Sequence, residues 1–158
     1  MIVVSVGTNE ARFDRLLEWV ASLQLDEEVV VQHGPSTVRV PDARCVEYLP
    51  FDDLVDLVRR SRAFVTHAGV GSIMMSLSAG RRPVVVPRLK RFREAVDDHQ
   101  LPLAKRLDRE GLVTLGESAE TLRRALSDAE HGFARAVGAT RLQRELHGYL
   151  HALALTDR

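Results

Sequence analysis

A histidine, two glycines and a serine end an apolar run in the segment FVTHAGVGS, residues 64–72. Glycine lets backbone N–H groups approach an anion closely, and a helix that begins there adds a favourable field. A second glycine turn, VGT at residues 6–8, follows another apolar run. Glycine turns of this kind are purely structural about as often as they bind a ligand. Two of them at the same edge of a sheet could, however, bind one diphosphate together.

The best-known nucleotide-binding fingerprints do not fit these turns. The dinucleotide pattern G-x-G-x-x-G does not fit either turn. After Gly7 the next glycine is Gly34, and in the pattern that starts with Gly69 and Gly71 the third glycine is replaced by Met74. The chain also contains no Gly-Lys-Ser or Gly-Lys-Thr, so the P-loop pattern is absent.

The elements that must position these turns alternate along the chain. Continuous apolar runs predict buried strands, and helical periodicity predicts the intervening helices. The expected strands are residues 2–6, 28–33, 44–49, 63–66, 83–87 and 112–115, and the expected helices cover about 13–20, 52–60, 72–79, 97–107 and 118–126. This order predicts an α/β fold, a Rossmann-like doubly wound parallel sheet, which binds ligands at the carboxyl ends of its strands.

Composition narrows the class of protein. The 158 residues are 45% hydrophobic and 28% charged with a formal net charge of zero, which argues against a nucleic-acid partner. One cysteine, no signal-peptide pattern and no run of about 20 apolar residues predict a soluble cytoplasmic protein. We expect one domain at residues 1–128, with an amphipathic helical extension at 129–158 whose continuity three glycines make uncertain.

The order of motifs is far more specific than any single glycine turn. The segment THAGVGSIMMSLSAGRRPVVVPR, followed by EAVDDHQLPLAKRL and EGLV, resembles the family 28 C-terminal domain, the donor-binding half of GT-B glycosyltransferases. The resemblance spans about residues 1–126 and is strongest at 64–107. It implies binding of a UDP-sugar without a metal or other cofactor.

The resemblance also implies roles for particular residues. His67, Gly69, Gly71 and Ser72 would bind the donor diphosphate, unless His67 is a structural histidine on a backbone carbonyl or Ser72 only a helix cap. Gln100 would reach the sugar hydroxyls or else form a capping box with Asp97. The remaining expected donor-site positions are Gly7, Thr8, Phe51 (its backbone near uracil, its side chain in the core), Arg88, Asp98 and His99.

Two features leave alternatives open. Met75 stands eight residues after the histidine, where related donor sites commonly carry a glutamate that binds both ribose hydroxyls. A thioether cannot replace that carboxylate, so another group compensates or catalysis is impaired. The loop RLKRFR, residues 88–93, has four basic residues in six. It is either a solvated loop or an attachment to an anionic membrane or lipid-diphosphate acceptor.

The resemblance implies that this chain carries one of the two substrate sites of an enzyme. By resemblance, this chain would supply the donor site of an inverting glycosyltransferase, and a membrane-anchored partner would supply the lipid-linked acceptor site and the general base. The partner would recruit the chain to the inner face of the membrane. The alternatives are a non-catalytic UDP-sugar-binding or regulatory subunit and, less favoured by length and glycine pattern, an epimerase-like Rossmann enzyme. The sequence does not fix the donor sugar.

Overall fold

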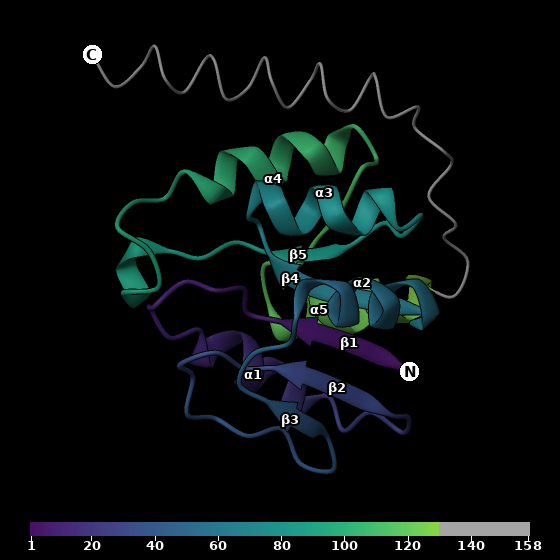
Figure 1. Ribbon diagram of the computed structural model, residues 1–158. Helices are drawn as coiled ribbons and strands as arrows, with labels where there is room; N and C mark the ends of the chain where they lie inside the picture. Colours follow the sequence, from purple (N-terminus) through teal and green to yellow (C-terminus); the bar gives the residue numbers. More distant parts are fainter. Residues whose placement is uncertain (130–158) are drawn as a thin grey trace.

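The computed structural model describes residues 1–129 and contains one six-stranded sheet (Figure 1). All its neighbouring strands are parallel, in the order β3-β2-β1-β4-β5-β6. The alternating pattern predicts this kind of sheet, a doubly wound parallel one, although it does not specify the strand order. The strands are β1 (Ile2–Ser5), β2 (Val29–Gln32), β3 (Arg44–Val46), β4 (Ala63–His67), β5 (Val84–Val86) and β6 (Thr114–Leu115).

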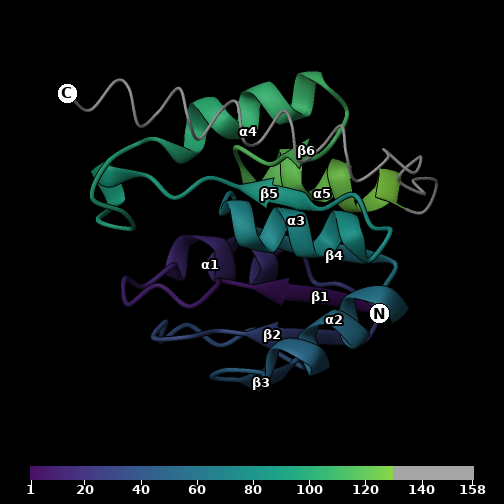
Figure 2. The same ribbon diagram turned by 45° about the horizontal axis from the view of Figure 1, so that its top comes forward.

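Helices cover both faces of the sheet (Figure 2). One face packs on α1 (Asp14–Ser22) and α5 (Ala119–Asp128). The other packs on α2 (Phe51–Arg60), α3 (Val70–Ser78) and α4 (Gln100–Arg109). Successive residues of one strand therefore enter different clusters: Val4 lies in the α1 and α5 layer, and Val3 in the α2 and α3 layer. Two covered faces explain why the central strands read as unbroken apolar runs.

Some element boundaries differ from those predicted. α3 begins at Val70 with Gly69 as its N-cap, so Ser72 is in the first turn and does not cap the helix. The Asp97–Gln100 capping box is also wrong, because the Asp97 carboxylate accepts the His99 N–H instead, at 3.1 Å. The capping box that does form joins Ser118 to Thr121 at the start of α5. Apart from Ala129, the predicted extension at 129–158 lies outside the described residues.

The order of the sheet defines where a ligand site is expected. β1 and β4 are neighbours, and the chain winds outward from them in opposite directions, to β2 and β3 on one side and to β5 and β6 on the other. Loops therefore diverge at the carboxyl ends of β1 and β4, which is where ligands typically bind in this class of sheet. Gly7 follows β1 there, and His67 ends β4.

Candidate functional site

The imidazole of His67 lies against both glycine turns. A Cβ placed on Gly7 would be 2.4 Å from His67 Nε2, and one placed on Gly69 would be 2.0 Å from His67 Cε1. Both contacts are too short for a real side chain, so the two glycines make room for the ring. A ligand held at these turns would consequently meet the imidazole as well as the backbone.

Gly71 differs from the other two glycines. A Cβ at this position would meet nothing within 4 Å, so open space adjoins the first turn of α3. The Ile73 N–H donates to the Gly69 carbonyl at 3.1 Å as the helix begins. The N–H groups of Val70, Gly71 and Ser72 precede the first helical hydrogen bond and have no acceptor within the helix. The start of α3 is therefore able to receive an anion.

Two side chains hold the His67 ring. Ser72 Oγ is 3.3 Å from His67 Nε2, and Gln100 Nε2 is 3.5 Å from His67 Nδ1. Burial, followed by the positive charge of Arg88, lowers the pKa of His67 from 6.5 to about 4. The imidazole is therefore neutral at pH 7. Neither partner is the backbone carbonyl that a purely structural histidine was expected to use.

The turn at Gly7 rests on two buried polar residues that the sequence analysis missed. Ser5 Oγ accepts the Gly7 N–H at 3.2 Å and also lies 3.2 Å from the amide nitrogen of Gln32. The same amide donates to the Gly7 carbonyl at 3.3 Å, while its oxygen accepts the Leu49 N–H at 3.1 Å. Gly7 has φ +80°, a conformation that glycine adopts without strain. Polar residues at the ends of the apolar strands IVVS and VVVQ were the available signal.

Arg88 is fully buried, and the expectation that it faces the donor is wrong. Its guanidinium donates to carbonyls of two loops: those of Val6 at 2.8 Å, Ala11 at 2.9 Å and Arg12 at 3.3 Å before α1, and that of Glu94 at 3.0 Å before α4. Burial, opposed by the charge of Glu94 and reinforced by that of Arg15, lowers the pKa of Arg88 to about 10. Arg88 stays charged at pH 7 and joins the two loops.

Arg15 and Glu94 reinforce the same connection. The Glu94 carboxylate receives two hydrogen bonds from Arg15, at 2.9 and 2.7 Å, and the Leu89 N–H at 2.9 Å. Arg15 also donates to the Pro87 carbonyl at 2.7 Å. Its guanidinium carbon lies 4.7 Å from the ring centre of Trp19 and 4.9 Å from that of Phe92. Of the four basic residues in the loop at 88–93, Arg88 thus points inward and the other three are exposed.

Met75 is buried and Phe51 is exposed, whereas the sequence placed Met75 at the donor site and the Phe51 side chain in the core. Met75 is 8% exposed and belongs to the core cluster between β1, β2, β4, α2 and α3, so its side chain does not face an open ribose position. Phe51 is 68% exposed at the start of α2, and the expectation that its side chain joins the core is wrong.

The other predicted residues are spread along the carboxyl edge. Thr8 is exposed beside the Gly7 turn. Asp98 accepts the Lys90 N–H at 2.7 Å, and His99 pairs with the carboxylate of Asp97. Asp98 also lines a cavity of about 170 Å³ with Arg91 at the ends of β5 and β6. Gln100 therefore is the member of the Asp-His-Gln segment that reaches His67.

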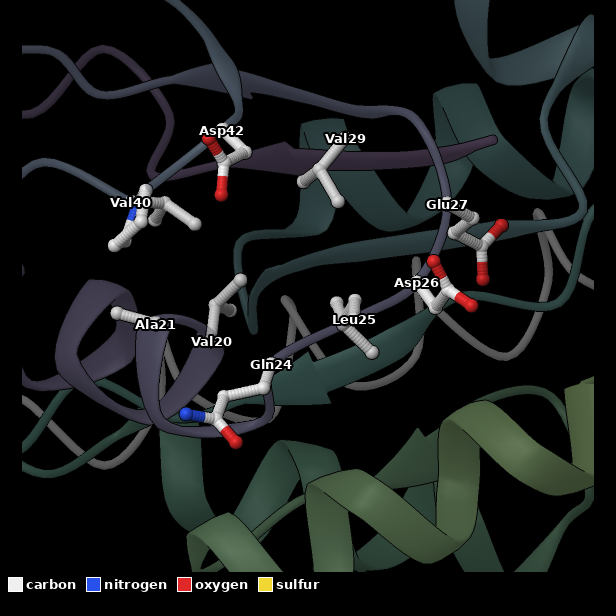
Figure 3. Close-up of a pocket in the computed structure, with 10 residues that line it drawn as sticks. Val20, Ala21, Gln24, Leu25, Asp26, Glu27, Val29, Val40 and Asp42 are labelled. Carbon is white, nitrogen blue, oxygen red and sulfur yellow. The ribbon is translucent and has the colours of Figure 1, made fainter.

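A larger cavity, of about 490 Å³, lies elsewhere (Figure 3). The end of α1 and the beginning of β2 line it, including Val20 and Val29, together with Asp42 before β3. It opens at the amino ends of the strands, away from His67. Within residues 1–129, no three His, Cys, Asp or Glu side chains are grouped to hold a metal ion, and no helix is long and apolar enough to cross a membrane.

Comparison with protein families identifies the domain. Residues 1–140 match the family model of the glycosyltransferase family 28 C-terminal domain. The chain belongs to this family. The match includes every strand and helix of the sheet domain described above, from β1 to α5.

Two curated relatives share a name. The UDP-N-acetylglucosamine transferase subunit ALG13 of Homo sapiens is 34% identical over 124 residues, covering 70% of this chain and 10% of that protein. The subunit of the same name from Yarrowia lipolytica is 38% identical over 58 residues, covering 37% of this chain and 28% of that protein. The chain therefore spans a small part of either relative's length.

Solved structures confirm the fold. The calicheamicin glycosyltransferase CalG4 superposes with a TM-score of 0.64 at 20% identity, covering 93% of this chain and 38% of that one. MurG of Acinetobacter baumannii gives a TM-score of 0.57 at 23% identity, covering 88% of this chain and 44% of that one. The chain thus has the fold of part of a GT-B glycosyltransferase, as predicted.

Proposed function

We propose that this chain is the donor-binding subunit of an inverting glycosyltransferase that uses a UDP-sugar. One observation carries the proposal: His67 lies beside the open first turn of α3, at the carboxyl ends of β1 and β4, from which the chain winds outward in opposite directions. Backbone N–H groups at a helix start and an imidazole N–H can together bind a diphosphate. The names of both ALG13 relatives favour UDP-N-acetylglucosamine as the donor.

The proposed chemistry is stabilisation of the leaving group. Negative charge develops on the diphosphate as the bond between the sugar and UDP breaks. Fixed N–H groups aimed at that charge lower the barrier because they need no reorganisation during the reaction. A diphosphate beside His67 would also raise the pKa of the ring from about 4, because an anion favours the protonated form. We assign no general base to this chain.

Acceptor binding would belong to a second protein, because both ALG13 relatives are named as subunits of a transferase. We propose a membrane-associated partner that supplies the lipid-linked acceptor, with this chain recruited from the cytoplasm. The exposed basic residues Lys90, Arg91 and Arg93 lie on the loop between β5 and α4, on the same edge as the site, and would favour an anionic acceptor.

Calorimetric titration with UDP and a panel of UDP-sugars tests the donor site. We expect binding that weakens about ten- to a hundredfold in His67→Ala, because a hydrogen bond to a charged group contributes about 1.5–3 kcal/mol. Lys105→Ala on the exposed side of α4 is the control and should bind as the unmodified chain does. Undiminished UDP binding by His67→Ala would contradict the proposed site.

A non-catalytic UDP-sugar-binding or regulatory subunit is the second candidate. The observation that favours it is Met75, which packs in the core where related donor sites commonly carry a ribose-binding glutamate. Transfer of labelled sugar to a lipid acceptor by the chain together with its partner distinguishes the two. Turnover that depends on His67 supports the catalytic subunit, whereas tight UDP-sugar binding without turnover supports the alternative.

A further inference from the structure

The orientation of the Gln100 amide is fixed by a backbone group. Its oxygen lies 3.1 Å from the N–H of Arg88, which can only donate. The amide nitrogen must therefore point the other way, where it lies 3.5 Å from His67 Nδ1. The side chain is only 7% exposed and belongs to the first residue of α4, so few other orientations are open to it.

This orientation determines which nitrogen of His67 carries the proton. An amide –NH₂ group has no acceptor, so Nδ1 must accept the hydrogen bond. A neutral imidazole holds one proton, and the pKa of about 4 keeps the ring neutral at pH 7. The proton is then on Nε2. That atom lies 3.3 Å from Ser72 Oγ and faces the Gly7 turn.

We propose that Gln100 is a positioning residue that sets the tautomer of His67 so that the Nε2–H points at the anion site. The Arg88 N–H that orients Gln100 is itself immobilised by the four carbonyl contacts of the Arg88 guanidinium. Gln100 then affects the donor diphosphate through His67, whether or not its amide also contacts the sugar hydroxyls. The effect on the donor rests on the proposed function, whereas the tautomer does not.

Imidazole NMR tests the tautomer in the protein without ligand. Long-range ¹H–¹⁵N correlation distinguishes a protonated from an unprotonated ring nitrogen, and the signals that disappear in His67→Asn identify His67 among the six histidines. We expect Nε2 protonated and Nδ1 unprotonated in the unmodified chain at pH 7. In Gln100→Glu, the carboxylate can only accept, so we expect a proton on Nδ1. A ring with its proton on Nδ1 in the unmodified chain would overturn the proposal.

Binding of UDP, which lacks the transferred sugar of the donor, separates the two roles of Gln100. Gln100→Met keeps the length of the side chain but removes both the amide donor and the oxygen that accepts the Arg88 N–H. If Gln100 acts through His67, affinity for UDP should fall about fivefold, as expected for the loss of a neutral hydrogen bond. Unchanged UDP affinity with weaker UDP-sugar affinity would make Gln100 a sugar contact and refute the proposal. An unmodified chain that bound no UDP would instead refute the proposed function, and the NMR spectrum would still decide the tautomer.

Discussion

Removing the Arg88 side chain should destabilise the whole domain. Arg88→Met keeps an apolar chain against Phe13, whose ring centre lies 4.6 Å from the guanidinium carbon, but deletes every donor. Four buried or half-buried carbonyl contacts, at 2.8–3.3 Å, lose their partner at once. The substitution therefore isolates the polar contribution of Arg88 from its packing.

The expected loss is large on the scale of a single domain. One hydrogen bond to a charged group contributes about 1.5–3 kcal/mol, and the four are not additive because they share one donor group. Breaking a buried charged network by removing one member typically costs about 3–5 kcal/mol. We therefore expect Arg88→Met to lose about 3–5 kcal/mol of a total unfolding free energy of about 5–15 kcal/mol. Arg88→Lys keeps the charge without the planar fork and should lose an intermediate amount.

Urea unfolding followed by circular dichroism measures this loss. A lower midpoint with an unchanged denaturant slope reports a change in stability alone. Arg91→Met in the same loop is the matched control, and its exposed side chain predicts a change within about 0.5 kcal/mol. The reasoning fails if Arg88→Met loses less than about 1 kcal/mol. It also fails if that variant keeps its stability and loses UDP affinity, because Arg88 would then face the donor.

Three other substitutions or conditions test the same structure. Met75→Glu should lose about 2–4 kcal/mol of unfolding free energy at pH 7, less at low pH, and should not improve UDP affinity, whereas Met75→Leu should lose less than about 1.5 kcal/mol. The pKa of His67 is about 4 in the folded chain and about 6.5 in the unfolded chain, so its contribution to the unfolding free energy should be complete above pH 6.5 and fall by up to about 3 kcal/mol towards pH 4. Denaturant unfolding at a series of pH values measures this loss, and the dependence on pH should be weaker in His67→Asn. Gly69→Ala should displace the imidazole, so that the pKa of His67, measured by NMR, rises back towards 6.5. Gly71→Ala is the control, because its Cβ would lie in open space and should leave the pKa of the ring unchanged.

The sheet could be predicted because its determinants are local. Apolar runs such as IVVS and AFVT mark strands buried on both faces, and their alternation with helical patterns indicates parallel order. The position of the Gly7 and His67 turns follows from that topology. The start of a helix is harder to predict where a glycine motif overlaps it. The sequence predicts that this helix begins at Ser72, whereas Ser72 lies inside the first turn of α3.

The contacts within the site could not be predicted because they join distant parts of the chain. Arg15 and Glu94 are separated by 79 residues, and Arg88 reaches Val6 across 82. In the sequence, Arg88 belongs either to a solvated basic loop or to the donor site, and only three-dimensional packing reveals that it is buried. The same holds for the contact between Gln100 and His67, because residue type alone assigns Gln100 to a sugar contact or to a helix cap and does not point to the histidine.

Trp19, the single tryptophan of the chain, stacks on Arg15, and Arg15 is bonded to Glu94. Its indole emission therefore provides a label-free optical reporter located one ion pair away from the loops that frame the histidine. Mixing experiments that follow this fluorescence would time any rearrangement of those loops without an introduced dye.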